Sequence, residues 1–243
     1  MKRSSGPLKV GIVGAGKMGR EIAGAAAARG HAVAWTLDGS GNRDASGITA
    51  ERVAAVDAVL EFTTPAAAPG NLVALARCGA RVVCGTTGWS DELPRIADAF
   101  RSGGGALVYA SNFSIGVRFL FEVAERAAAL YSRSGYAPYI VEEHHAAKKD
   151  APSGTAKTLA AAVERGGGVA APVVSVRAGT IPGTHRLVFE SPEDEIEIVH
   201  RARGRAGFAR GAVWAAERIA GRRGVFEFGE ILSEASGLAG EEP

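Results

Sequence analysis

The densest group of side chains suited to acid–base chemistry lies between residues 142 and 156, which read EEHHAAKKDAPSGTA. The imidazole of His144, whose ordinary pKa is about 6.5, can give or take a proton near neutral pH. Lys148 supplies a cation that can hold a carboxylate or deliver a proton. We therefore interpret His144 and Lys148 as the candidate catalytic pair.

The end of the same stretch predicts the start of a helix that runs from Ser153 to Glu164. The backbone N–H groups of a first helical turn have no partner within the helix, so Gly154 and Thr155 are candidates for binding a carboxylate. Two plainer interpretations stay open. Ser153 could serve only as a helix cap, and Lys148 could be only a solvated loop residue.

The histidines form no recognisable metal motif. His144 and His145 point to opposite faces of an extended chain, which argues against one ion bound by both. Neither His-Glu-x-x-His nor Cys-x-x-Cys occurs in the sequence. The sequence thus predicts no metal site. We interpret His31, His185 and His200 as structural, because each lies in a strand-like stretch.

A second candidate site is the glycine-rich segment GAGKMG, which places G-x-G-x-x-G between a predicted strand and a predicted helix. Its glycines allow a tight turn, a close approach to a pyrophosphate and close packing of the helix on the strand. An acidic residue at the end of the second strand lies where the adenine ribose binds. The cofactor-binding residues predicted here are Gly14, Gly16, Gly19 and Asp38, and Lys17 is either a phosphate contact or a solvated cation at the helix start. The alternative is an ordinary glycine-rich turn with a solvated aspartate.

Two further loops follow predicted strands and present small side chains, hydroxyl groups and an amide. Ligands bind at the carboxyl ends of strands in doubly wound sheets, so both loops are expected to border the nicotinamide. The residues concerned are Gly85, Thr86, Thr87 and Gly88 in the first loop, and Ala110, Ser111, Asn112 and Phe113 in the second.

The order of the predicted elements indicates two domains. Strands at 8–13, 31–37, 57–63, 81–84 and 106–110 alternate with helices at 18–29, 71–77 and 91–101. This alternation is typical of an α/β, Rossmann-like, doubly wound parallel sheet. Beyond residue 112 come helices at 115–131 and 153–164 and strands at 139–143, 173–178, 186–190 and 195–201. Strands without helices between them predict a second, α+β domain with a mixed or antiparallel sheet. A helix at 212–220 and a short apolar tail at 225–232 complete the prediction.

Composition excludes several classes of protein. The 243 residues are 47% hydrophobic and 22% charged, with a net charge of +2, as in ordinary globular proteins. No apolar run reaches the length of a membrane span, and no basic stretch alternates with aromatic residues, so we expect neither a membrane nor a nucleic acid as partner. Two cysteines cannot form a disulfide framework, and no apolar segment of a secretory signal follows the N-terminus, so we expect a cytoplasmic protein.

Four segments together resemble the dihydrodipicolinate reductase family of the lysine and diaminopimelate pathway, whose members are also called 4-hydroxy-tetrahydrodipicolinate reductases. They are the glycine loop, the GTTGW segment from Gly85, the SNFSIGV segment from Ser111 and the HHAAKKDAPSGTA segment from His144. The last segment is highly specific to the family, whereas the glycine loop is not. The resemblance covers the chain from Lys9 to Leu232.

The resemblance implies reduction of a cyclic dicarboxylate by NADH or NADPH. It makes His144 the acid/base and Lys148 the proton donor, and it assigns His145, Gly154 and Thr155 to substrate binding. It also extends the cofactor site to Ala15, Lys17 and Met18. It further implies a homotetramer assembled through the second sheet, with a C-terminal helix that returns to the first domain. The expected dinucleotide-binding domain is then residues 1–112 with 214–243, and residues 113–213 form the substrate-binding and oligomerisation domain.

The cofactor segment departs from the pattern of many family members, which have one more residue in the glycine loop. Here Asp38 is followed by Gly39 and Ser40, not by an immediate arginine. A carboxylate at this position disfavours a 2′-phosphate, so we expect use of both cofactors with a preference for NADH. Lys17, Ser40 or Arg43 could still support NADPH. Two alternatives remain: another imine or amino-acid dehydrogenase on the same scaffold, and a non-catalytic NAD(P)-binding redox sensor.

Overall fold

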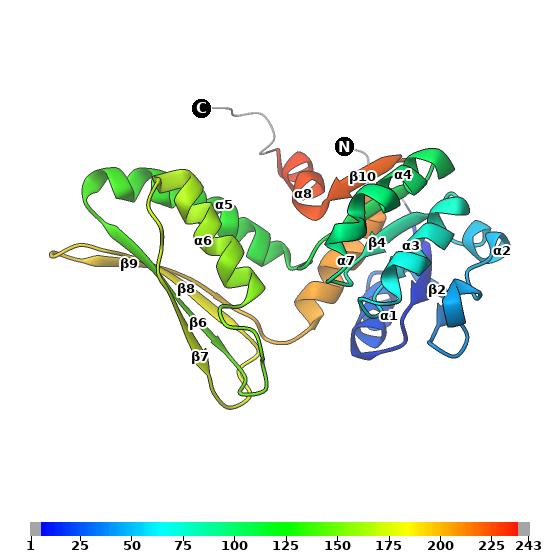
Figure 1. Ribbon diagram of the computed structural model, residues 1–243, viewed down its shortest axis with the longest axis horizontal. Coiled ribbons are helices and arrows are strands. Elements are labelled where there is room, and N and C mark those ends of the chain that lie inside the picture. The colour runs from blue at the N-terminus through cyan, green and yellow to red at the C-terminus, as the bar shows by residue number, and fades with distance from the viewer. Residues whose placement is uncertain (1–5, 238–243) are drawn as a thin grey trace. The chain divides into compact units, whose positions relative to one another are not determined.

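The structure is a computed structural model that describes residues 6–237. The chain divides into two compact units (Figure 1). Unit 1 contains the chain up to Phe113 and again from Phe208, and unit 2 contains Ser114–Gly207. The chain returns to unit 1 at Phe208, ahead of the residue 214 expected from the sequence. The reason is that helix α7 begins at Ala206 and not at residue 212.

The sheet of unit 1 has six parallel strands in the order β10-β5-β4-β3-β1-β2. Strand β1 lies between β2 and β3, so the chain winds outward in both directions from it, as a doubly wound sheet requires. This confirms the predicted fold of the first domain. The strands are β1 Lys9–Val13, β2 Ala32–Leu37, β3 Ala58–Glu61, β4 Arg81–Cys84, β5 Ala106–Tyr109 and β10 Gly224–Glu227.

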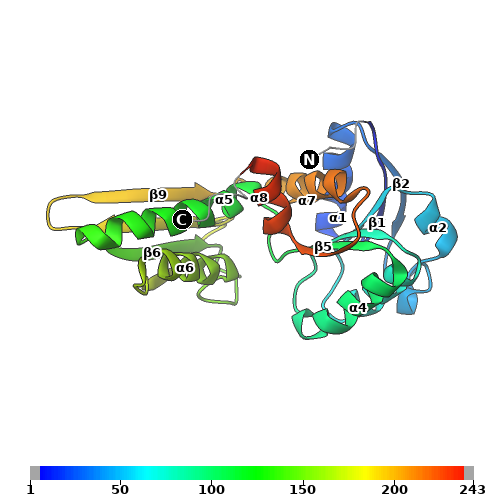
Figure 2. The ribbon, with the colours of Figure 1, turned by 90° about the horizontal axis from the view of Figure 1, so that it is seen from above.

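Helices cover both faces of this sheet, which is why most of its strands are apolar along their whole length. Figure 2 shows α1 and α7 over one face and α4 over the other. The helices are α1 Lys17–Ala28, α2 Ala50–Ala54, α3 Ala68–Arg77, α4 Leu93–Gly103, α7 Ala206–Ile219 and α8 Phe228–Ser236, with 3₁₀ turns η1 Arg43–Ala45 and η2 Ser90–Glu92. Helix α2 was not predicted, because its five residues carry too little periodicity.

The expectation of an apolar tail at residues 225–232 is wrong. Residues Gly224–Glu227 form β10, which pairs in parallel with β5 as the edge strand of the sheet. Helix α8 follows at once, and its first turn is held by a capping box between Glu227 and Glu230. A four-residue strand directly joined to a helix has no turn residues to mark it, so sequence patterning missed both elements.

The sheet of unit 2 has four strands in the order β7-β6-β8-β9. Strands β6 and β7 are parallel and the other neighbours are antiparallel, which confirms the predicted mixed sheet. Figure 1 shows α5 and α6 together on one face of it. The elements are α5 Ile115–Tyr131, η3 Ser132–Ser134, β6 Ala137–His144, α6 Gly154–Gly167, β7 Val173–Arg177, β8 Thr184–Glu190 and β9 Glu195–Arg201.

Alternation along β6 and β8 explains how this sheet places polar groups beside α6. Ile140 and Leu187 pair across the two strands and are fully buried against α5 and α6. Because side chains alternate with a period of two, Glu142 and His144 lie on the same face as Ile140. His185, which pairs with Glu142, joins them. The end of an apolar face thus becomes a buried polar cluster.

The other face of this sheet carries exposed valines. Val174 and Val176 of β7 are 54% and 36% exposed. Within residues 6–237, no helix combines the length and the apolar character needed to cross a bilayer.

Candidate active site

The glycine loop lies between β1 and α1, and its backbone geometry requires glycine at two positions. Gly14 has φ +112°, and a Cβ atom there would lie 2.1 Å from the Phe62 carbonyl oxygen. A Cβ atom on Gly19 would lie 1.8 Å from the Gly14 carbonyl oxygen, so the helix could not approach the strand. Gly16 is the N-cap of α1, with open space beside it. Ala15, Lys17 and Met18 complete the segment at the helix N-terminus, where the helix dipole favours a phosphate.

Asp38 follows β2 directly and is exposed. Its Oδ1 atom accepts hydrogen bonds from the backbone N–H groups of Ser40 (3.0 Å) and Gly41 (2.8 Å) and from the Ser40 hydroxyl (2.7 Å). The Gly41 and Ser40 hydrogen bonds lower the pKa of Asp38 below its ordinary value. The residue that the sequence assigns to the adenine ribose is therefore an ionised carboxylate at neutral pH, held by its own turn.

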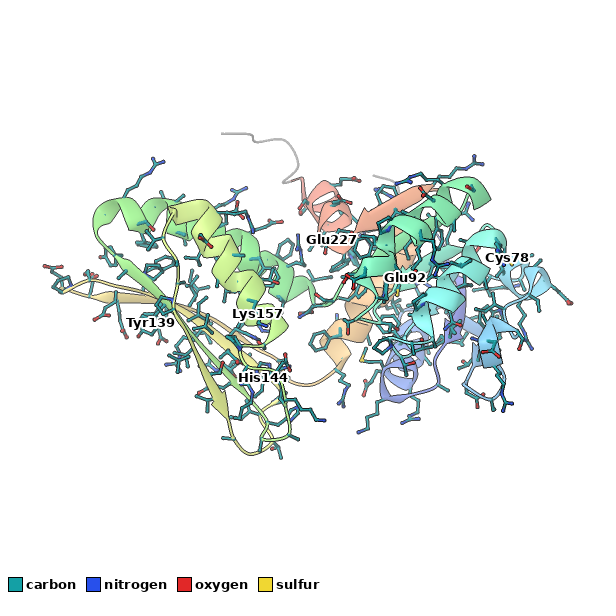
Figure 3. All side chains as sticks on the ribbon, in the orientation of Figure 1. Cys78, Glu92, Tyr139, His144, Lys157 and Glu227 are labelled. Carbon is teal, nitrogen blue, oxygen red and sulfur yellow. The ribbon has the colours of Figure 1, made fainter. Side chains whose placement is uncertain are left out.

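The two predicted nicotinamide loops meet at a cavity of about 280 Å³ at the carboxyl ends of β4, β5 and β10. Residues of both loops line this open cavity, together with the aromatic residues Trp89 and Tyr109. Gly85, Asn112 and Phe113 are not among the lining residues. The lining residues are Thr86, Thr87, Gly88, Trp89, Ser90, Leu93, Tyr109, Ala110, Ser111 and Glu227. Glu227, labelled in Figure 3, comes from the strand that the sequence did not reveal.

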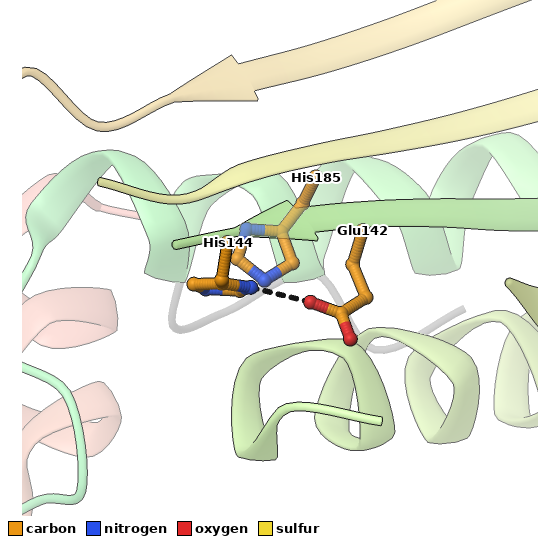
Figure 4. A group of neighbouring side chains, drawn as sticks. All are labelled: Glu142, His144 and His185. Atoms are coloured by element: carbon orange, nitrogen blue, oxygen red, sulfur yellow. Dashed lines mark hydrogen bonds and ion pairs between the residues drawn. The ribbon is translucent and has the colours of Figure 1, made fainter. Parts of the chain in front are cut away.

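In unit 2, Glu142 and His144 form a buried pair at the end of β6 (Figure 4). His144 Nδ1 binds Glu142 Oε2. Because a carboxylate only accepts hydrogen bonds, Nδ1 carries the proton and Nε2 of the neutral ring is left as the acceptor. The pair thus fixes the tautomer and the orientation of the imidazole that the sequence predicts to be catalytic.

The second oxygen of Glu142 connects this pair to the start of α6. Oε1 accepts a hydrogen bond from Arg177 Nη2 at 2.6 Å and one from the Ser153 backbone N–H at 3.3 Å. The Ser153 hydroxyl caps α6 by accepting the Ala156 N–H at 3.2 Å. One carboxylate therefore sets the positions of both the imidazole and the helix N-terminus.

Lys148 and the predicted substrate residues surround the same helix start. Lys148 Nζ lies 2.7 Å from Asp150 Oδ1, and this ion pair lowers the pKa of Asp150. Gly154 and Thr155 form the first turn of α6, and His145 is exposed just beyond the end of β6. Asp150 also accepts a hydrogen bond from the Gly154 backbone N–H, so its carboxylate binds both the ammonium group and the start of α6. These two groups have the charge to bind a carboxylate.

Burial and the neighbouring charges determine the protonation of the cluster. Burial lowers the pKa of His144, and the hydrogen bond and charge of Glu142 oppose this effect. Burial, together with the charge of His144, lowers the pKa of His185 to about 4. Burial disfavours ionised Glu142, yet hydrogen bonds from Arg177, Ser175, His144 and Ser153 prevail and lower its pKa to about 2. At neutral pH the cluster holds one carboxylate, one guanidinium and neutral imidazoles.

Sequence reasoning missed three members of this cluster: Glu142, Arg177 and His185. His185, expected to be a structural strand residue, has its ring centroid 5.2 Å from that of His144 and its Nε2 3.1 Å from the Ser153 hydroxyl. Only the pairing of β6 with β7 and β8 brings these residues together. The Glu-Glu pair before His144 was the one available signal, since alternation places Glu142 on the face of His144.

Glu142, His144 and His185 offer potential ligand atoms within 4.8 Å of one another, the composition of a metal site. However, Arg177 and His144 already bind the two oxygens of Glu142. The guanidinium and the ammonium of Lys148 also add positive charge to the cluster. This arrangement suits proton transfer and the binding of an anion better than the binding of a cation.

Comparison with known proteins gives a consistent result. Residues 8–113 match the family described as dihydrodipicolinate reductase, N-terminus, and residues 116–232 match dihydrodipicolinate reductase, C-terminus. A 4-hydroxy-tetrahydrodipicolinate reductase of Christiangramia forsetii is 33% identical over 241 residues, covering 93% of this chain and 98% of that protein. One from Stenotrophomonas maltophilia is 46% identical over 169 residues, 69% of each chain.

A solved structure has the same fold. It is a dipicolinate-bound dihydrodipicolinate reductase from Paenisporosarcina sp. TG-14, which matches 91% of this chain and 98% of its own with a TM-score of 0.75. Its sequence is 23% identical to the present one, so the likeness concerns the fold alone.

Proposed function

The chain belongs to the dihydrodipicolinate reductase family, and we propose that its two units divide the reaction, unit 1 binding NADH or NADPH and unit 2 the substrate. The activity is the NAD(P)H-dependent reduction of 4-hydroxy-tetrahydrodipicolinate in lysine and diaminopimelate biosynthesis. Family membership favours this activity over the two alternatives, another dehydrogenase and a redox sensor.

The observation that carries the assignment of roles is the Glu142–His144 pair beside the N-terminus of α6. The substrate is a dianion, and Lys148 with the amides of Gly154 and Thr155 supplies positive charge for one carboxylate. His145 is the further substrate-binding residue. These roles make unit 2 a site that orients the ring before reduction.

The bound cofactor supplies the hydride. The 4-hydroxyl group of the substrate leaves as water, which gives the C=C–C=N system that is reduced. Hydride addition to this system builds negative charge on the ring, which a proton donor must neutralise. Lys148 donates that proton and is then reprotonated by solvent. His144, held as the Nδ1–H tautomer by Glu142, has Nε2 available to accept or return a proton as acid/base.

In unit 1 the cofactor-binding residues are those of the glycine loop, Asp38 and the two loops at the carboxyl ends of β4 and β5. The glycine contacts at positions 14 and 19, the exposed N-terminus of α1 and the cavity bordered by Thr86 and Ser111 support this assignment. The order of strand, glycine loop and helix that a dinucleotide site needs is complete here.

We further place the protein in the cytoplasm as a homotetramer assembled through the open face of the second sheet. The exposed Val174 and Val176 on that face support the assembly, since a second copy would remove them from water. Cys78 and Cys84 are free thiols, as is usual in a reducing compartment.

The decisive test supplies freshly made product of the preceding aldolase-like synthase and follows oxidation of NADH and of NADPH. We expect wild-type turnover with both cofactors, and a fall in kcat of roughly 100-fold in His144→Ala and in Lys148→Ala, the range for lost acid–base catalysis. Lys149→Ala is the matched control, because Lys149 is an exposed lysine of the same loop. Near-full activity of His144→Ala or of Lys148→Ala would contradict the catalytic role proposed for that residue.

A further inference from the structure

Glu61, the last residue of β3, is a fully buried acid in the middle of the parallel sheet of unit 1. Among residues 6–237 no lysine, arginine or histidine pairs with it. Instead, uncharged donors surround its carboxyl group: Asn71 Nδ2 at 3.1 Å, the Thr86 hydroxyl at 2.7 Å, Cys84 Sγ at 3.3 Å and the Thr63 hydroxyl. Glu61 is therefore the centre of a buried hydrogen-bond network.

This network joins the loops that follow neighbouring strands. Thr63 belongs to the loop after β3 and Thr86 to the loop after β4. The Thr86 hydroxyl donates to Glu61 Oε2 and accepts the Thr63 backbone N–H at 2.7 Å. Both loops are thus tied to one carboxylate as well as to each other.

The network also reaches the loop after β2. Asn71, which donates to Glu61, accepts a hydrogen bond from Asn42 Nδ2 at 2.8 Å through its side-chain oxygen. Asn42 in turn accepts the Gly47 backbone N–H at 3.1 Å. The loop that contains Asn42 begins just after Asp38, the residue assigned to the ribose.

Burying an acidic group without a cationic partner is costly. The neighbouring strand residues Val59 and Leu60 are apolar and buried, so packing of the sheet does not itself require an acid at position 61. An apolar residue at position 61 would satisfy the packing but leave the threonine hydroxyls and the Asn71 amide without an acceptor. The buried acid is better explained by the loops it orders, because a fully satisfied polar network fixes one geometry.

We propose that Glu61 is the positioning residue of the cofactor site, holding the loops after β3 and β4, through Thr63 and Thr86, in the shape that binds the dinucleotide. The inference rests on the proposed function, in which Thr86 belongs to the nicotinamide loop. Glu61 acts only through these loops and touches neither cofactor nor substrate in this scheme.

The test replaces Glu61 by Gln, which keeps the shape but turns one acceptor into a donor. We expect the Kd for NADH, measured by fluorescence titration, and the KM for NADH to rise roughly tenfold. The KM for the dicarboxylate and the kcat at saturating NADH are expected to stay within about twofold. A loss of folded protein would instead lower the apparent kcat and leave both KM values unchanged.

Glu217→Gln is the matched control, because Glu217 is also a fully buried glutamate of unit 1 and binds Arg29 and His31. It is expected to lower thermal stability and leave the Kd for NADH unchanged. If Glu61→Gln fails to fold, Thr63→Val removes one donor of the network, and Thr63→Ser is expected to restore the affinity lost in it.

The outcomes separate the inference from the function. Wild-type protein that binds neither NADH nor NADPH overturns the proposed function and this inference with it. Wild-type protein that binds NADH, with an unchanged Kd in Glu61→Gln and in Thr63→Val, overturns the inference alone.

Discussion

The backbone of Gly183 passes so close to His144 that a Cβ atom on residue 183 would lie 3.0 Å from His144 Nε2. Gly183 precedes β8 and has φ +146°, a conformation that side chains rarely adopt. The nitrogen that Glu142 leaves available for chemistry is thus the one that a side chain at residue 183 would crowd.

Gly183→Ala should therefore impair catalysis. The added methyl group forces either the backbone or the imidazole to move, and a displacement of a catalytic group costs up to roughly 100-fold in rate. We expect kcat/KM to fall about 10- to 100-fold in the coupled assay. Gly168→Ala is the control: Gly168 has φ +67° and no atom near its Cβ position, so it carries backbone strain without touching His144. Equal losses in the two variants would contradict the prediction.

The buried His185 should make the folded protein sensitive to mild acid. Its pKa of about 4 in the folded state lies below the ordinary value of about 6.5 in an unfolded chain, chiefly because of burial. Above pH ~6.5 the ring is neutral in both states. As the pH falls from ~6.5 to ~4 only the unfolded chain gains the proton, so the free energy of unfolding decreases, by at most about 3 kcal/mol.

Urea unfolding across this pH range tests the effect. His185→Asn should flatten the pH dependence between pH ~6.5 and ~4, whereas His145→Asn, which changes an exposed histidine, should leave it as in the wild type. Glu142, with a pKa of about 2, contributes in the same direction but only below its ordinary pKa of about 4.5. Parallel curves for wild type and His185→Asn would contradict the prediction.

Asp38 should set the preference between the two cofactors. Its ionised carboxylate repels a 2′-phosphate, and the repulsion is modest because the group is exposed and water screens it. Asp38→Asn keeps an oxygen for the turn with Ser40 and Gly41 but removes the charge. We expect kcat/KM for NADPH to rise roughly fivefold with little change for NADH. Glu51→Gln, an exposed charge change on α2, is the control, and a wild-type enzyme that strongly prefers NADPH would refute the argument.

The open face of the second sheet should carry the contacts between subunits. Val174→Asp places a charge on β7 at a side chain that is 54% exposed. Desolvating that charge in an interface opposes assembly, so we expect a smaller species than the wild type in sedimentation velocity. Val169→Asp, at a valine of similar exposure (46%) outside the sheet, should leave the mass unchanged. A monomeric wild-type protein would refute the proposed tetramer.

Local features of the sequence were enough to predict much of this protein. The G-x-G-x-x-G loop, the alternation of strands and helices before residue 112 and the run of strands after it predicted both sheets. Each depends on the conformational freedom of glycine or on the periodicity of a single element. The His144–Lys148 segment could be recognised as a candidate site for the same reason, because its polar groups are neighbours along the chain.

Tertiary structure alone decided which distant residues join these segments. Arg177 and His185 reach Glu142 because β6 pairs with β7 and β8, and Glu61 reaches Thr86 because β3 pairs with β4. Strand β10 was likewise recognisable only beside β5. Pairing between strands depends on register and burial over the whole sheet, so a strand's own residues do not specify which side chains its partners will place against it.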